Sequence, residues 1–122
     1  MAAKLDELAR GLSAFARDLG TDLDRVTLVA WSEFGRRVAE NASAGLDHGH
    51  GGAMLVLGGH VAGGQVISSW PTLAPASLDH GDLAITIDYR DILSEILGER
   101  MACTSLGTVF PGWVATPRGV TA

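Results

Sequence analysis

Histidines and an aspartate are concentrated in one short glycine-flanked segment, Gly45 to Leu55, with the sequence GLDHGHGGAML. Asp47, His48 and His50 occupy three of four consecutive positions. Imidazole and carboxylate are usual ligands of Zn²⁺, and a catalytic zinc site needs about three protein ligands beside one position for water. Side chains at i and i+2 of an extended segment point to the same side, so both histidines can reach one ion or two neighbouring ions. The segment predicts a metal site in which Asp47 is either a ligand or holds a histidine.

The same spacing also fits a polar surface loop, because short metal motifs match many unrelated sequences. His60 and His80 stand alone in turn-like surroundings, where histidines are ordinarily solvated, and we treat them as weaker candidate ligands. Glu33 follows an apolar run and is either a further ligand or a helix cap favoured by the helix dipole. Arg36 and Arg37 are by default a solvated helix face.

Two apolar runs near these residues predict buried strands, RVTLVAW at residues 25–31 and AMLVL at residues 53–57. A short helix is predicted between them, at about residues 34–41. Strand, helix and strand in this order indicate an α/β fold with a small, at least partly parallel sheet flanked by helices. In such sheets ligands gather beyond the carboxyl ends of the strands, and Glu33 lies just past the first strand.

Helices are also predicted near both ends of the chain. One apolar face, ending near Gly20, is formed by Leu5, Leu8, Leu12, Phe15 and Leu19. Another helix is predicted from Tyr89 to Leu97, between an Asp88 N-cap and Gly98, with a buried stripe of Ile92, Leu93, Ile96 and Leu97. Residues 58–70 predict a turn and a short edge strand. Four aspartates are expected to cap turns and the helix predicted at residues 89–97: Asp79, Asp82, Asp88 and Asp91.

The composition bounds the class of protein. With 122 residues, 47% of them hydrophobic and 19% charged, the chain has a globular balance and is predicted to form one domain over residues 1–122. A net charge of −5 argues against nucleic-acid binding, which needs clustered lysines and arginines. The sequence shows neither an export signal nor a run of roughly 18 apolar residues, so we expect a cytoplasmic protein without a membrane partner. Cys103, the only cysteine, excludes an internal disulfide.

Five motifs in a fixed order resemble a known family. They are SEFGRR (32–37), GLDHGHGGAMLVLGG (45–59), WPTLAP (70–75), DYRDILSEIL (88–97) and VFPGW (109–113). Together they are similar to the C-terminal portion of the bacterial domain-of-unknown-function 1501 family, which is placed in the alkaline phosphatase and sulfatase superfamily. The resemblance runs from about Leu5 to Trp113 and implies a truncated alkaline-phosphatase-like core.

The resemblance also implies chemistry. In that superfamily two metal ions, commonly zinc, lie at strand ends, and phosphate or sulfate esters are hydrolysed. Glu33 then corresponds to a strand-end ligand, and the Asp47–His50 segment to the place of the last histidine ligand. Arg36, in the EFGR motif, is a candidate for holding a phosphoryl oxygen, because its fork matches that geometry. His60 and His80 stand where relatives usually lack histidine and are candidate substitute ligands.

Two functional hypotheses follow. The superfamily's nucleophile belongs to an N-terminal part that the chain does not match, so no residue is assigned a catalytic role. The first hypothesis is a metal-dependent hydrolase of phosphate esters, most of all diesters, that uses Zn²⁺ or another transition metal such as Mn²⁺ and a metal-bound hydroxide. The second is a non-catalytic metal-binding or structural fragment. We also expect a homodimer, because the apolar helix face and the two strands are a large hydrophobic load for so few residues.

Overall fold

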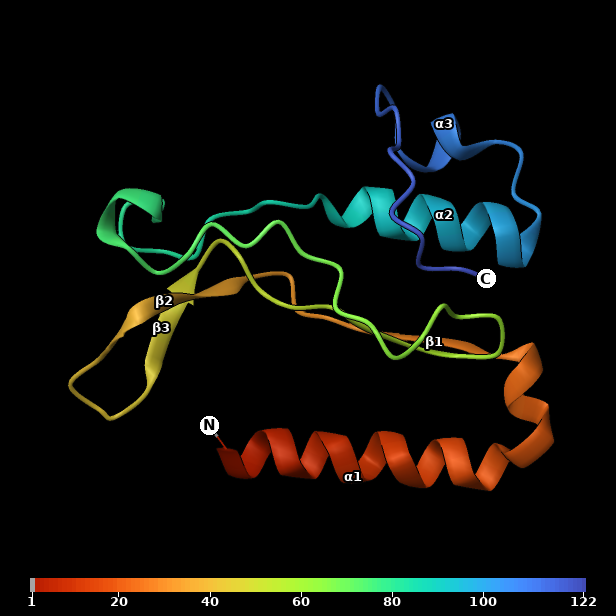
Figure 1. The fold of residues 1–122 in the computed structure, drawn as a ribbon, viewed down its shortest axis with the longest axis horizontal. Helices are drawn as coiled ribbons and strands as arrows, with labels where there is room; N and C mark the ends of the chain where they lie inside the picture. The colour runs from red at the N-terminus through yellow and green to blue at the C-terminus, as the bar shows by residue number, and fades with distance from the viewer. Residues whose placement is uncertain (1) are drawn as a thin grey trace.

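A computed structural model describes residues 2–122, which combine helices and short strands (Figure 1). In chain order the elements are α1 (Ala2–Leu19), the 3₁₀ helix η1 (Gly20–Arg25), β1 (Thr27–Ala30), β2 (Gly35–Glu40), β3 (Leu46–Gly49), β4 (Leu55–Gly58), the 3₁₀ helix η2 (Pro75–Ser77), α2 (Tyr89–Met101) and α3 (Leu106–Val109). Within residues 2–122, no helix has both the length and the apolar character needed to span a membrane.

The strands form two separate antiparallel pairs. β1 pairs with β4, with Val29 opposite Val56, and β2 pairs with β3, with Arg36 opposite His48. The predicted parallel sheet is therefore wrong, and the pairing gives no support to an alkaline-phosphatase-like core. The reason is that the segment predicted to be the crossover helix is the strand β2. Without that helix nothing returns the chain to the starting end of β1, so β4 runs in the opposite direction.

The β2–β3 hairpin forms because its turn and its glycines specify it. Asn41 Oδ1 accepts hydrogen bonds from the backbone N–H groups of Ser43 and Gly45, each at 3.0 Å, which closes the loop. Gly35 is buried, and a Cβ at this position would collide with the backbone of Gly51. Pairing across the hairpin thus outweighs the helical character of the RRVAE sequence.

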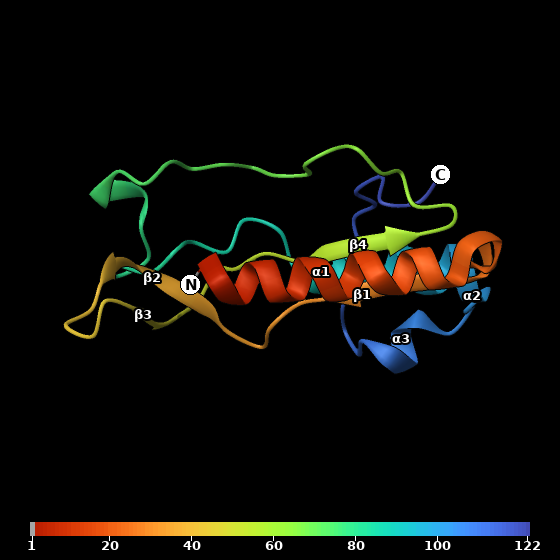
Figure 2. The same ribbon diagram turned by 90° about the horizontal axis from the view of Figure 1, so that it is seen from below.

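Three layers position these strands. α1 and α2 lie on opposite sides of the β1–β4 pair, as the two ribbon views show (Figures 1 and 2). The buried core lies on the α2 side and consists of Ile92, Ile96 and Val120, with half-buried Val29, Met54, Val56, Ile67 and Ile87 packed against it. β1 and most of β4 are half-buried, in contrast to the predicted burial on both faces.

The α1 side of the molecule is open by comparison. No residue of α1 is buried, and Leu5 is 59% exposed. The chain exposes 8442 Å², whereas a compact monomer of 12.7 kDa would expose roughly 6,200 Å². The fold therefore leaves a large surface uncovered, and large hydrophobic side chains such as Leu5 and Phe15 on α1 contribute to it.

Both predicted terminal helices are present. α1 ends at Leu19, before Gly20 with a φ of 52°, as predicted. α2 begins after Asp88, whose side chain accepts a hydrogen bond from the Arg90 backbone, but it continues past Gly98 to Met101 and ends at left-handed Ala102. The edge strand predicted in residues 58–70 is wrong, because only Val61 pairs there, in a single bridge to Thr121.

Two carboxylates of α2 hold the C-terminal segment. Asp91, which is 2% exposed, accepts hydrogen bonds from Trp113 Nε1 and the Thr116 backbone and pairs with Arg118 at 2.6 Å. Glu95 accepts hydrogen bonds from four successive backbone N–H groups, at residues 118–121. Burial by itself raises the pKa of Glu95, but these hydrogen bonds outweigh it and lower the pKa. Asp91 and Glu95 are therefore structural clamps, and Asp91 is not a simple helix cap.

Candidate functional site

The tetrapeptide Leu-Asp-His-Gly occurs twice, at residues 46–49 and 78–81. The first copy is β3, whereas the second opens a tight turn in which Asp79 and Asp82 exchange backbone hydrogen bonds. His80 and Gly81, at the centre of this turn, have φ values of 52° and 94°, the signs that a type I′ turn requires. A bridge between Asp82 and Arg37 attaches the turn to β2. The two copies therefore lie at the same end of the molecule.

Side chains of four residues meet where the turn joins the hairpin, and we call them the His50 cluster: His50, Asp79, His80 and Asp82. His50 Nδ1 lies 2.6 Å from Asp79 Oδ2, and His50 Nε2 lies 3.9 Å from Asp82 Oδ2. His80 Nε2 lies 3.8 Å from Asp79 Oδ1. The cluster faces solvent, because His80 is 97% exposed and His50 is about half exposed. Both imidazoles and the Asp79 carboxylate are thus accessible to a ligand, whereas the Asp82 side chain is only 16% exposed.

Electrostatics favour the protonated form of His50. Its pKa is raised, first by the hydrogen bond to Asp79, then by the charge of Asp79 and, more weakly, of Asp82, while partial desolvation opposes the shift. Arg37 borders the cluster, with Nε 3.4 Å from Asp82 Oδ1 and Nη2 donating to the His80 carbonyl at 2.9 Å. A metal ion that binds here must displace the His50 proton, so protons and metal compete.

The structure places His48 and Arg36 in a different environment. The His48 ring stacks on Phe34, with ring centroids 3.8 Å apart and an interplanar angle of 23°. Arg36 lies over the same phenyl ring, 5.2 Å from its centroid, and donates from Nη1 to the Leu46 carbonyl at 2.9 Å. These contacts stabilise the hairpin face and keep the His48 ring out of the His50 cluster.

The other predicted ligands also lie apart. Asp47 Oδ1 accepts a hydrogen bond from Asn41 Nδ2 at 2.7 Å, which supports the hairpin turn. Glu33 is exposed and precedes a strand, so it caps no helix. His60 lies next to β4 with a φ of 56°, and its carbonyl accepts a hydrogen bond from Ala122. Of the predicted set, only His50 and His80 come together, and among residues 2–122 no three His, Cys, Asp or Glu side chains are already arranged to hold a metal.

Sequence reasoning missed three members of this region, Arg37, Asp79 and Asp82. The repeated Leu-Asp-His-Gly motif was the available signal, together with His-Gly at a place where a type I′ turn favours Asn-Gly. Histidine tolerates a positive φ better than most residues. The pairing of His50 with Asp79, 29 positions later, depends on the bridge between β2 and the turn, which no local pattern encodes.

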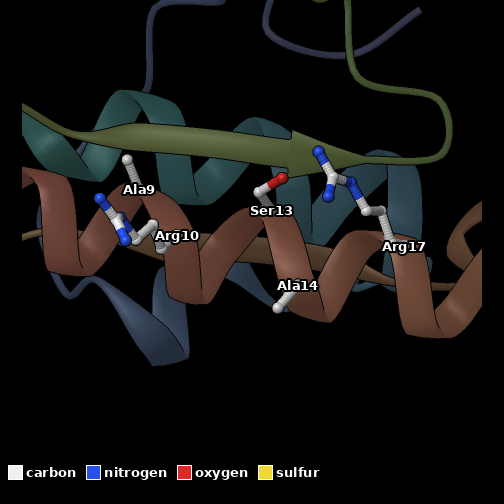
Figure 3. A pocket seen from close by; sticks show the side chains of 5 residues that line it. All are labelled: Ala9, Arg10, Ser13, Ala14 and Arg17. Atoms are coloured by element: carbon white, nitrogen blue, oxygen red, sulfur yellow. The ribbon is translucent and has the colours of Figure 1, made fainter.

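A shallow hollow lies elsewhere, on α1 (Figure 3). It measures about 350 Å³ and is lined by Ala9, Arg10, Ser13, Ala14 and Arg17. All five side chains come from one helix, so the hollow is a gap between two arginines over small residues. Arg10 also pairs with Asp6 at 2.8 Å. Nothing here converges on a ligand, and the His50 cluster remains the candidate site.

The model of a family described as a protein of unknown function, DUF1501, matches residues 1–109. The chain belongs to this family. No curated protein and no solved structure matches it. The matched range of the DUF1501 protein includes the whole His50 cluster and both clamp residues of α2, whereas the segment that they hold, residues 113–121, lies beyond the match.

Proposed function

We propose that this DUF1501 protein is a metal-dependent hydrolase of phosphate esters, with phosphodiesters as its preferred class, and that a divalent transition metal binds at the His50 cluster. The observation that carries the proposal is the 2.6 Å contact between His50 and Asp79, which joins the two Leu-Asp-His-Gly segments. Membership of the alkaline phosphatase and sulfatase superfamily is part of the proposal and rests on the resemblance of motifs.

The donor set fits such a metal in residue type. Imidazole and carboxylate suit Zn²⁺ or Mn²⁺, whereas Mg²⁺ and Ca²⁺ prefer all-oxygen sites. Ligands about 2.1 Å from a tetrahedral ion lie about 3.4 Å from each other. The nitrogen–oxygen separations in the cluster range from 2.6 to 3.9 Å, but His50 contacts Asp79 through Nδ1 and Asp82 through Nε2, and a single ion would take only one of these nitrogens. Rotations of the His50 side chain and of the exposed His80 side chain would therefore be needed to bring three donors around one ion. When bound, a divalent metal lowers the pKa of its water toward about 7 and polarises a phosphoryl oxygen.

The chain's own residues have separate tasks in this proposal. Arg37 keeps Asp82 oriented toward the cluster through their 3.4 Å pair. Arg36, the predicted phosphoryl-binding residue, makes one hydrogen bond, and further N–H groups of its guanidinium are available to a substrate anion. Because neighbouring residues of a strand point to opposite faces, Arg37 is the nearer of the two arginines to the cluster. Separate Arg36→Ala and Arg37→Ala variants distinguish them by their effect on KM for a phosphodiester.

A second candidate function is metal binding without turnover. It is favoured by the exposure of His80, since an open cluster neither excludes water nor encloses a substrate. This alternative predicts the same metal affinity as the first and no hydrolysis above the metal ion alone.

The test begins with chelator-stripped protein. Calorimetric titration with Zn²⁺ and with Mn²⁺ measures affinity, and hydrolysis of bis(p-nitrophenyl) phosphate at increasing metal occupancy and pH measures turnover. We expect about one ion per chain, turnover that follows occupancy, and a loss of affinity of about tenfold or more in Asp79→Asn and His50→Gln. His60→Asn is the matched control, because it removes an exposed histidine outside the cluster while asparagine tolerates its positive φ.

Each result decides between the candidates. Turnover that survives complete metal removal would overturn the mechanism. Binding of less than a tenth of an equivalent, or affinity that Asp79→Asn leaves unchanged, would overturn the site. Tight binding with no turnover would establish the second candidate function instead.

A further inference from the structure

One flank of α1 carries a regular row of exposed positions, which we call the α1 seam: Lys4, Leu8, Gly11, Phe15 and Asp18. The successive spacings of four and three average 3.5 residues, so the row follows one line along the helix. All five positions are exposed, and Leu8 and Phe15 are each 42% exposed. Leu12, Ala16 and Leu19, by contrast, are half-buried. The seam therefore has an apolar centre, Leu8 and Phe15 on either side of Gly11, between two charged ends, and the molecule's own fold does not cover it.

We propose that the α1 seam is an interface between two copies of this chain, in which the two helices pack antiparallel about a twofold axis at Gly11. The α1 seam shares no residue with the His50 cluster, so this inference does not depend on the proposed hydrolase activity. It specifies which surface forms the homodimer that is predicted from the apolar helix face and the two apolar strands.

Charge and shape complementarity select the antiparallel arrangement. With Gly11 opposite the partner's Gly11, Lys4 faces the partner's Asp18 at each end, and Leu8 meets the partner's Phe15 on both sides of the axis. A parallel, in-register pair would instead place lysine against lysine and aspartate against aspartate. Lys4 now pairs with Glu7 at 2.9 Å, but both side chains are more than 70% exposed, so water screens that pair and it rearranges at little cost.

Gly11 is otherwise hard to explain. A glycine inside a helix is less stable than alanine by about 0.8–1 kcal/mol. A Cβ at Gly11 would meet nothing within 4 Å, so the isolated chain has no steric need for glycine there. Close approach of a second backbone is a standard reason for glycine. The crossing point of two antiparallel α1 helices supplies that reason.

The uncovered surface fits a weak dimer. The chain exposes 8442 Å², well above the roughly 6,200 Å² of a compact monomer of its mass. A single helix seam is nevertheless small beside a standard interface of about 1,600 Å². We therefore expect a dissociation constant in the micromolar range, which sedimentation over about 1–200 µM protein resolves.

Charge reversal tests the seam without touching the core. Lys4→Asp alone places aspartate opposite the partner's Asp18 and should weaken association about tenfold, at two repelling pairs per dimer. The double variant Lys4→Asp/Asp18→Lys restores opposite charges and should regain most of the affinity. Far-ultraviolet circular dichroism checks that helix content is unchanged. If the double variant associates as weakly as the single variant, the proposed pairing of Lys4 with the partner's Asp18 is wrong.

Substitutions at the axis give an independent readout. Gly11→Leu should raise the stability of the monomer, because leucine is the better helix former and has room, yet abolish the dimer by separating the helices. Gly11→Cys in a Cys103→Ser background should form a disulfide between copies on mild oxidation. A wild-type chain that stays monomeric at 200 µM would overturn the proposal. So would a dimer that survives Gly11→Leu and forms no such disulfide, and it would indicate pairing at the open edge of β1.

Discussion

Residues 46–49 and 78–81 share the sequence Leu-Asp-His-Gly and adopt different backbones. In the first copy the chain is extended, paired with β2, and followed by buried Gly51. In the second the chain reverses at His80 and Gly81, both with positive φ. The backbone conformation of these four residues is therefore set by their hydrogen-bonding partners and not by their identity. Backbone hydrogen bonds to β2 determine where each copy is extended and where it turns.

The difference in backbone gives each histidine a different role. His48 lies flat on Phe34 and contributes to the hairpin, whereas His80 has no packed neighbour and points a ring nitrogen toward Asp79. The aspartates differ in the same way, since Asp47 supports a turn through Asn41 while Asp79 binds His50. The first copy is structural, and the second lies in the proposed metal site. Four predictions test this contrast, beginning with the largest effect.

The two glycines should differ most. A Cβ on Gly49 would lie 2.7 Å from the Arg36 carbonyl carbon and 2.8 Å from the Arg37 nitrogen, which are backbone atoms that cannot move aside. Gly49→Ala should therefore cost about 3 kcal/mol of unfolding free energy. Gly81→Ala meets only the mobile end of Arg37 and a positive φ, and should cost about 1–2 kcal/mol. Urea denaturation measures both, and an equal or reversed order would contradict the contrast.

Metal affinity should show the opposite order. His80→Asn removes a proposed ligand and should lower Zn²⁺ affinity about tenfold, while asparagine keeps the turn because it tolerates a positive φ. His48→Asn should leave the affinity unchanged. If His48→Asn instead abolishes binding and His80→Asn does not, the metal site is the one predicted from sequence around Asp47, His48 and Glu33.

The sequence predicts the helices well because their information is local. The three-and-four spacing from Leu5 to Leu19, the Asp88 N-cap and the apolar runs at β1 and β4 each follow from neighbouring residues. The hairpin was misassigned because arginine, alanine and glutamate in β2 favour a helix. Only distant contacts, such as buried Gly35 against Gly51, override that preference.

The sequence predicts which residue types form the candidate site, but not which individual residues come together there. Histidine chemistry identified His50 and His80, and the cluster contains both. Asp79 and Asp82 looked like turn residues, which they also are, and their second role requires a turn docked on β2 from 45 residues away in sequence. A single sequence carries no direct record of that docking, so local spacing favours Asp47 and His48 as ligands instead.

The next prediction concerns stability at the two histidines. His48→Asn should lower the unfolding free energy by about 1 kcal/mol, because it removes the stacked ring on Phe34. His80→Asn should change it by less than about 0.5 kcal/mol, as expected of an exposed side chain. A double-mutant cycle with Phe34→Leu isolates the stacking contribution. A coupling energy near zero would show that the rings touch without stabilising each other.

The smallest expected effect separates the two aspartates by pH. Asp79 raises the pKa of His50 above its ordinary value, so the folded state holds the proton more tightly than the unfolded chain. The resulting stabilisation is complete below about pH 6.5, the unfolded value, and is lost as pH rises through the folded pKa. Water screens this half-exposed pair, so the effect is small.

Asp79→Asn should lower the His50 pKa toward its ordinary value and remove the corresponding pH dependence above about pH 6.5. Asp47→Asn is the matched control, because Asp47 bonds to Asn41 and not to His50. Titration of the His50 imidazole by NMR in metal-free protein measures the pKa directly, and urea midpoints across the same range measure the linkage. An equal fall in the His50 pKa in both variants would mean that general negative charge, rather than the Asp79 hydrogen bond, holds the proton, and that the two copies do not differ in this respect.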